Sequence, residues 1–182
     1  MGVSGFNAIA YGYGAFEGIR SYETEHGTKV FKAEEHYERL KKSCELVKIP
    51  FDYKVQELVE ATYELLEKNN LKNAYIRPLV YCAPNMSLTK PTSVSLMIAV
   101  WDWGAYLGEK LLRLTVSSYC RPHPRSIKIE AKVCGHYVNS ILASQEAKAK
   151  GFDEALLLDM NGNVAEAPGA NLFYEKDGKL FT

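Results

Sequence analysis

Apolar residues recur at helical spacing in three segments of the chain, and each predicts an amphipathic helix. The segments are residues 34–48, 54–68 and 137–150. Pro50 is expected to end the first helix, since proline cannot continue the hydrogen-bonding pattern. Gly151 is expected to cap the third. The second has the clearest stripe, formed by Val55, Leu58, Val59, Thr62, Leu65 and Leu66.

Between the helices, segments rich in β-branched and aromatic residues predict strands. These are residues 28–33, 73–82, 93–103 and 111–119, followed by short strands at 154–159, 164–167, 171–175 and 179–182. Two prolines predict a loop at 120–126. Helices and strands together predict an α+β protein with a first unit to about residue 108 and a second after it. The last strand ends flush with Thr182, so we expect the second unit to be incomplete in this chain.

Composition adds few constraints beyond excluding some partners. The chain has 47% hydrophobic residues and 22 residues of each charge sign, so its net charge is zero. Neither a nucleic acid nor an anionic membrane is a predicted partner. The longest apolar run is shorter than the roughly 20 residues of a membrane span. The four cysteines show no metal-ligand spacing, which predicts no metal site, and scattered thiols favour a cytoplasmic location.

Lys132 lies in unusual surroundings, between Ala131 on one side and Val133 and Cys134 on the other. One interpretation is an ordinary solvated lysine. The other is a Schiff-base lysine, because an amine must be unprotonated to attack a carbonyl and apolar surroundings favour that form. The residues alone leave both open.

Four other residues each allow a structural and a functional interpretation. Arg39 either pairs with Glu35 on its helix or presents its guanidinium to a phosphate. Arg77 lies in an apolar strand and needs an anion, which is either a structural carboxylate or a substrate. Tyr137 is either a core aromatic or a hydroxyl donor. Glu166 is either exposed or buried beside a cationic or N–H partner.

The segment 11–18, "YGYGAFEG", has a Gly-x-Gly pair typical of phosphate loops, but the dinucleotide fingerprint fails because Glu17 takes the place of the third glycine. A glycine-permitted chain passing a ligand, or a plain turn, is the favoured interpretation. A lysine, a tyrosine, an acid and an arginine would together suit pyridoxal phosphate.

Ordered motifs along almost the whole chain then carry a family resemblance. They are "YGYGAFEGIRSYET", "EEHYERLKKSCELVKIP", "AYIRPLVY", "WDWGAYLG", "AKVCGHYVNSILASQEAKAKGFDEALLLD" and "VAEAPGANLFYEKDGKLFT". The sequence resembles the class IV (fold-type-IV) pyridoxal-phosphate aminotransferases, and most closely the branched-chain amino acid aminotransferases.

The resemblance implies a two-domain α+β fold like that of D-amino acid aminotransferase, with the second domain truncated. The implied division is a small N-terminal domain at 1–108, an interdomain connection at 109–125, and the start of a cofactor-binding domain at 126–182. Family members are usually dimers, so a homodimer or higher homo-oligomer is expected.

The resemblance also implies roles for the cofactor-binding residues. Lys132 would form the Schiff base with pyridoxal phosphate and move the substrate α-proton. Tyr137 would bond the ring hydroxyl, Glu166 the pyridine nitrogen, and Arg39 the phosphate. Arg77 matches an arginine near the substrate carboxylate. The substrate side-chain pocket would be lined by Tyr11, Phe16, Tyr75, Trp103 and Tyr106.

Three positions depart from the family pattern: His136, Pro168 and Ala170. They match the edge of the pocket, with Ala170 at a substrate-contact position, so they concern substrate preference more than chemistry. The first hypothesis is amine transfer from Leu, Ile or Val to 2-oxoglutarate. The alternatives are an aminodeoxychorismate lyase or D-amino acid aminotransferase of the same fold, or a catalytically incomplete fragment.

Overall fold

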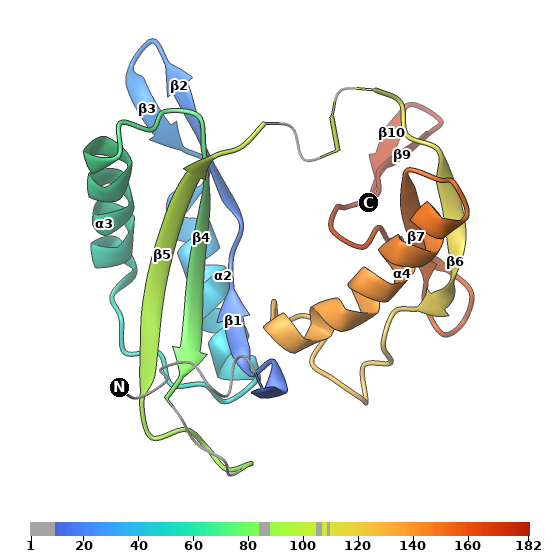
Figure 1. The fold of residues 1–182 in the computed structure, drawn as a ribbon, viewed down its shortest axis with the longest axis horizontal. Helices are drawn as coiled ribbons and strands as arrows, with labels where there is room; N and C mark the ends of the chain where they lie inside the picture. Colours follow the sequence, from blue (N-terminus) through green and yellow to red (C-terminus); the bar gives the residue numbers. More distant parts are fainter. Residues whose placement is uncertain (1–9, 84–87, 105–106, 109) are drawn as a thin grey trace. The chain divides into compact units, whose positions relative to one another are not determined.

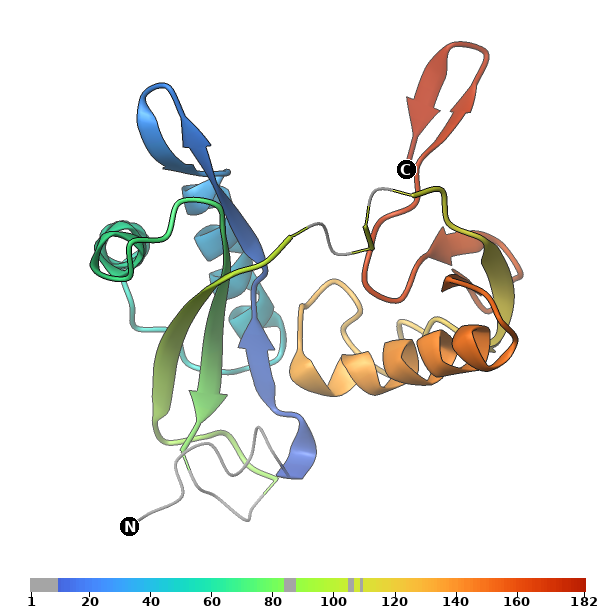
Figure 2. The same cartoon turned by 45° about the horizontal axis from the view of Figure 1, so that its top comes forward.

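The computed structural model of the chain describes residues 10–83, 88–104, 107–108 and 110–182. The chain divides into two compact units. The first runs to Gly108 and also takes in Glu130–Gly135, and the second takes the remaining residues. Figures 1 and 2 show the elements of each. The predicted division placed residues 130–135 in the second domain, whereas they group with the first unit. The predicted connection at 109–125 contains a strand, Leu114–Cys120. The domain assignment stays a prediction.

The first unit is built on an antiparallel five-stranded sheet centred on β4 (Ala74–Cys82). The neighbours of β4 are β1 (Gly14–Phe16) and β2 (Ile19–Thr24) along one edge and β5 (Val94–Asp102) along the other. β3 (Gly27–Val30) pairs with β2 at the margin. Every second residue of β4 is buried, because alternate side chains of a strand point to opposite faces of the sheet.

Helices α2 (Ala33–Leu46) and α3 (Val55–Lys68) pack on one face of this sheet (Figure 1). The two helices are also joined by a buried hydrogen bond of 2.5 Å between the hydroxyls of Tyr37 and Thr62. The core consists of apolar residues from both helices and from the inward side of the strands. Its largest members are Ile19, Tyr37, Leu40, Leu66, Ile76 and Val80.

Among the described residues, the three long helices α2, α3 and α4 (Tyr137–Ala149) end with the same backbone conformation. A residue with positive φ follows the last turn: Lys48 (φ 63°), Asn70 (φ 51°) and Gly151 (φ 79°). The next N–H then bonds back to the carbonyl five residues earlier, as from Ile49 to Cys44 at 2.8 Å. The predicted cap at Gly151 is confirmed. The first helix ends at Leu46, before the predicted stop at Pro50, because Lys48 has already left the helical conformation.

The second unit has a three-stranded sheet in the order β6-β7-β8. β6 (Leu114–Cys120) and β7 (Glu154–Leu158) are parallel and are connected through α4 (Tyr137–Ala149), while β8 (Val164–Glu166) is antiparallel to β7. A small core joins Ala143 and Ala147 of α4 to Ala155 and Leu157 of β7. A hairpin of β9 (Tyr174–Lys176) and β10 (Lys179–Phe181) follows.

The predicted helices, and the strands from residue 73 onward, are present with bounds shifted by up to three residues. β1 and β2 were missed, and at β1 the sequence suggested a turn or ligand-passing loop (11–18). β1 has only three residues, too few to show a period, and pairing with β4 defines it. Among the described residues, no helix has the length and apolar character of a membrane span.

Glu146 of α4 makes a testable contribution to the second unit. Its carboxylate accepts hydrogen bonds from Lys150, the Ser117 hydroxyl and the Ser118 N–H, which lower the pKa of Glu146 to about 2. A group with a lowered folded-state pKa stabilises the fold above its ordinary pKa, and that stability is lost as the pH falls toward the folded value. We expect Glu146→Gln to lower the melting temperature at neutral pH, and the deficit to vanish in strong acid.

Thermal unfolding of both proteins across this pH range tests the prediction. Glu175→Gln, which alters an exposed acid of the same unit, is the matched control and should show no such dependence. A Glu146→Gln deficit that does not change with pH would contradict the assignment.

Candidate active site

Phe16, the last residue of β1, and Glu17, which follows it, place their side chains on opposite faces of the first unit's sheet. Phe16 lies opposite Leu79 of β4 and is 7% exposed. The Arg77 guanidinium carbon is 4.6 Å from the centre of its ring, and the Lys132 amine nitrogen is 5.0 Å from it. Both distances are typical of cation–π contacts. Phe16 therefore brings together two cations that are far apart in the sequence.

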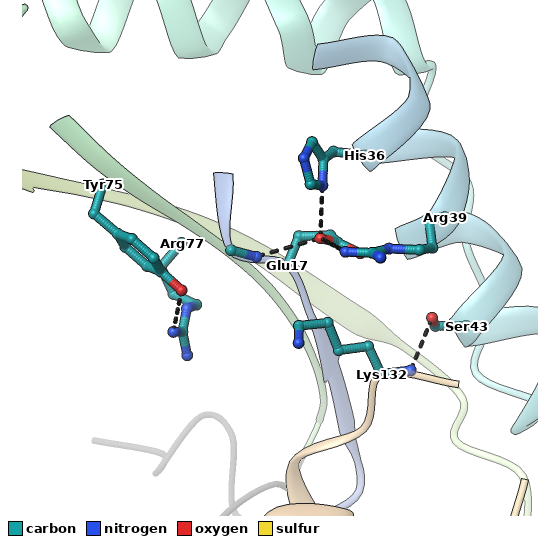
Figure 3. A network of polar contacts seen from close by, with 8 residues as sticks. Glu17, His36, Arg39, Ser43, Tyr75, Arg77 and Lys132 are labelled. Carbon is teal, nitrogen blue, oxygen red and sulfur yellow. Dashed lines mark hydrogen bonds and ion pairs between the residues drawn. The ribbon is translucent and has the colours of Figure 1, made fainter. Parts of the chain in front are cut away.

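The segment carrying Lys132 is fastened to β1 and α2 through its backbone. The Lys132 carbonyl accepts from the Phe16 N–H at 3.0 Å, and its N–H donates to the Ser43 hydroxyl at 3.0 Å. One bridge pairs Val133 with Ala15. Figure 3 shows the Lys132 side chain extending away from Ser43. The lysine is held by its main chain, and its own side chain is half-buried.

The neighbours of Lys132 in the sequence are small or apolar because most of them are buried. Ala131 and Val133 are buried, at 3% and 5% exposure. Burial raises the pKa of the Cys134 thiol. Gly135 donates its N–H to the Gly12 carbonyl at 2.9 Å, and a Cβ built on Gly12 would lie only 2.5 Å from the Gly135 Cα. Because residue 12 is a glycine, the main chain there can pack directly against Gly135. The sequence had suggested a ligand or a plain turn at this place.

Glu17 points to the opposite face, toward α2, and is fully buried. Arg39 donates to it twice, from Nε to Oε1 at 2.6 Å and from Nη2 to Oε2 at 2.7 Å, and His36 lies 2.9 Å from Oε2 (Figure 3). Burial opposes ionisation of Glu17, but these hydrogen bonds outweigh it and hold its pKa below the ordinary value. Glu35, which one interpretation of the sequence made the partner of Arg39, forms an ion pair with Lys32.

Arg77 and the aromatic side chains lie on the sheet face that carries Phe16. Arg77 donates from Nη2 to the Tyr75 hydroxyl at 2.5 Å, while its buried Nε has no hydrogen-bond partner in the described chain. A buried unpaired donor is costly, so this atom marks a place where an anion would be stabilised. The Tyr75 ring also packs edge-to-face with Trp103 and at a tilt against Trp101, with ring centres 4.8 and 5.0 Å apart.

In the second unit, Glu166 ends β8 and forms an ion pair with Arg121, whose Nε lies 2.6 Å from Oε1. The side chain of Glu166 is 37% exposed, so it is neither buried nor fully solvated. The cationic partner required by partial burial is thus Arg121, which the sequence did not suggest. Tyr137 begins α4 and is half-buried, and the carbonyl of Ala170 accepts from the Ala167 N–H at 3.1 Å.

The structure brings together, in the first unit, a set of the predicted residues that share contacts: Phe16, Tyr75, Arg77, Trp103 and Lys132, with Arg39 behind them on α2. Tyr11 is 47% exposed. Tyr106 lies outside the described residues, and Tyr137, Glu166 and Ala170 belong to the second unit. Within the described ranges, no group of His, Cys, Asp or Glu could hold a metal ion.

Sequence reasoning missed Glu17, His36, Ser43, Trp101 and Arg121. The spacing held a usable signal for two of them. His36 and Ser43 lie three residues before and four after Arg39, which places all three along one side of α2. Trp101 could have been found only from the strand register, which sets it directly opposite Tyr75.

A sequence model of the family described as amino-transferase class IV matches residues 14–182. The chain belongs to this family.

Named relatives of this chain are similar to it over nearly its whole length. The branched-chain-amino-acid aminotransferase of Pseudomonas aeruginosa is 42% identical, and that of Escherichia coli K12 is 41% identical. Each alignment covers 97% of this chain but 59% of the relative. The chain therefore spans about three-fifths of the length of these relatives.

Solved structures agree on the fold. The E. coli branched-chain amino acid aminotransferase superposes with a TM-score of 0.93 at 41% identity, covering 97% of this chain and 60% of that one. The enzyme from Thermoproteus uzoniensis, solved with norvaline, gives 0.91 at 37% identity, covering 96% and 60%. The enzyme from Thermobaculum terrenum, solved in its PLP-form, gives 0.83 at 34% identity, covering 92% and 56%. The implied fold-type-IV architecture is confirmed over the matched residues.

Proposed function

We propose that the protein is a pyridoxal-phosphate-dependent aminotransferase that moves the amine of branched-chain L-amino acids to 2-oxoglutarate. The products are the branched-chain 2-oxo acids and L-glutamate. The observation that carries the proposal is the Lys132 amine, held beside Phe16 and Arg77 on the face of the sheet opposite α2. The names of the similar proteins point to the same substrates.

The donor groups of this chain fit pyridoxal phosphate. Arg39 carries the planar guanidinium that suits a phosphate, and Lys132 the amine that suits an aldehyde. Glu166 offers a carboxylate for the pyridine nitrogen, and Tyr137 a hydroxyl for the ring oxygen. When bound, the cofactor would supply a carbonyl that takes up the amine and a ring that withdraws electrons.

The chain's own residues would do the remaining work. Lys132 Nζ would remove the proton from the substrate α-carbon and return it on the cofactor side, acting as a general base and then a general acid. Arg77, with its unpaired Nε, would hold a substrate carboxylate. Glu166, held in place by its ion pair with Arg121, would keep the pyridine nitrogen protonated.

Aromatic side chains explain the proposed substrate class. Phe16, Tyr75 and Trp103 would bind an aliphatic side chain by the apolar area they remove from water, worth about 1.5–3 kcal/mol when burial is complete. One methylene in such a pocket changes the binding by only about 1–3 kcal/mol. Broad use of leucine, isoleucine and valine follows.

We further propose that the active form is a cytoplasmic homodimer or higher homo-oligomer. This rests on the family resemblance and on the predicted reducing environment of the four thiols. Light scattering of the purified protein checks the assembly.

The test of the function is an amine-transfer assay with a cofactor spectrum. The protein mixed with pyridoxal phosphate should gain a visible absorbance band, and L-leucine should bleach it. L-Leucine with 2-oxoglutarate should then give L-glutamate. Faster turnover of D-alanine or aminodeoxychorismate would replace the proposal with another reaction. A bound cofactor without any turnover would show that residues 1–182 are catalytically incomplete.

A further inference from the structure

The buried Glu17 has no role in the chemistry above, yet it is the most completely buried acid in the site region. It directly follows Phe16, and its own N–H donates to the Pro78 carbonyl at 3.0 Å, so its main chain is fixed on the sheet. A buried carboxylate is strongly unfavourable unless it is paired. Glu17 therefore needs its partners on α2 in order to stay buried as a carboxylate, and its charge in turn holds their side chains in place.

Those partners belong to one polar stripe on α2. His36 and Arg39 both contact Glu17, and Ser43, one turn further along, accepts the Lys132 N–H (Figure 3). The stripe thus links the proposed phosphate anchor and the main chain of the proposed Schiff-base lysine within a single network. A disturbance at Glu17 is expected to reach Arg39 first, because the two are directly bonded.

The geometry of the Arg39 contact is what a positioned guanidinium requires. Two bonds, from Nε and Nη2, fix the plane of the group, while 54% of the side chain stays exposed. An arginine held in this way loses little further rotamer freedom when an anion binds. The negative charge of Glu17 opposes a nearby phosphate, so orientation must outweigh repulsion for Glu17 to help. The presence of His36 on the same carboxylate reduces that repulsion whenever its ring is protonated.

We propose that Glu17 is a positioning residue for the cofactor phosphate, acting through the guanidinium of Arg39. The inference rests on the proposed function, since it requires pyridoxal phosphate to bind.

The experiment compares pyridoxal phosphate with pyridoxal, which lacks only the phosphate. Dissociation constants for both are measured by absorbance titration of residues 1–182. The preference ratio is the dissociation constant of pyridoxal divided by that of pyridoxal phosphate, and its change between variants reports the anchoring of the phosphate. Glu17→Gln keeps the shape of the side chain and removes the charge. It should reduce the preference for pyridoxal phosphate about tenfold, as expected for a charge-assisted hydrogen bond. Glu38→Gln, which removes an exposed charge beside Arg39 on the same helix, should leave the ratio unchanged.

A second background separates positioning from a general loss of stability. Arg39→Lys keeps the charge but cannot form the two-point contact. In that background Glu17→Gln should change the ratio by no more than about twofold, because the two residues act as a unit. If Glu17→Gln does not fold, Glu17→Asp serves instead, and an intermediate loss of preference is expected.

The outcomes separate the two proposals. A wild-type protein that gains no absorbance band with pyridoxal phosphate refutes the proposed function. If the wild-type protein gains the band but a folded Glu17→Gln or Glu17→Asp variant keeps or increases the preference ratio for pyridoxal phosphate, the role of Glu17 is refuted. An equal loss in the Arg39 and Arg39→Lys backgrounds also refutes it, since the effect would then not pass through Arg39.

Discussion

Replacing Lys132 by alanine is expected to abolish the visible absorbance band with pyridoxal phosphate and to reduce amine transfer from L-leucine by roughly 10²–10⁴-fold or more. The amine is both the group that would join the cofactor aldehyde and the group that would move the α-proton. Arg77, the other cation on Phe16, is not expected to replace it, because a guanidinium is a poor nucleophile and a poor base.

The loss should be specific to chemistry. The Lys132 segment is held by main-chain bonds to Phe16 and Ser43, which an alanine keeps. The melting temperature of Lys132→Ala should therefore stay close to that of wild type. Lys128→Ala, which alters a lysine nearby in the sequence, is the control and should keep the band. A band that survives in Lys132→Ala would assign the Schiff base to another lysine.

Gly12→Ala is expected to destabilise the first unit strongly. At φ +64° an alanine is strained by about 1–2 kcal/mol. Its Cβ would also lie 2.5 Å from the Gly135 Cα and 2.8 Å from the Gly135 nitrogen. Both are main-chain atoms and cannot rotate away, so overpacking adds about 1–3 kcal/mol.

The clash would fall on the contact that fastens the lysine segment. To relieve it, Gly135 must move off Gly12, and the 2.9 Å hydrogen bond between them is lost. We expect lowered thermal stability together with weaker cofactor binding. Gly27→Ala is the matched control: Gly27 has φ +87° but nothing within 4 Å of a built Cβ, so it shares the strain without the clash. Equal melting temperatures for the two variants would contradict the proposed role of the close approach.

Elements that carry their own local signal could be predicted from sequence. The apolar stripe of α3 and the β-branched and aromatic content of β4 can each be recognised within one segment, and each element was found within a residue or two of its observed ends. β1 could not be found in this way. Three residues carry no period, and their conformation depends on pairing with β4, which is remote in the sequence.

The partners of charged residues were also beyond the sequence. A helix suggests its own i−4 neighbour, Glu35, as the partner of Arg39. The observed partner is Glu17, because a fully buried carboxylate competes for the guanidinium far more strongly than a solvated one. Likewise, Glu166 at the end of β8 forms an ion pair with Arg121, which follows β6, because β6 and β8 are the two neighbours of β7.

The sequence by itself determined the family, the α+β composition and the identity of the candidate lysine, because ordered motifs and local periods are properties of short segments. Only the tertiary structure decided that the lysine segment joins the first unit's sheet, that Phe16 carries two cations, and that Glu17 holds Arg39. Each of those contacts joins residues distant in the chain, and their spacing is set by strand pairing and by the burial of charge rather than by any local pattern.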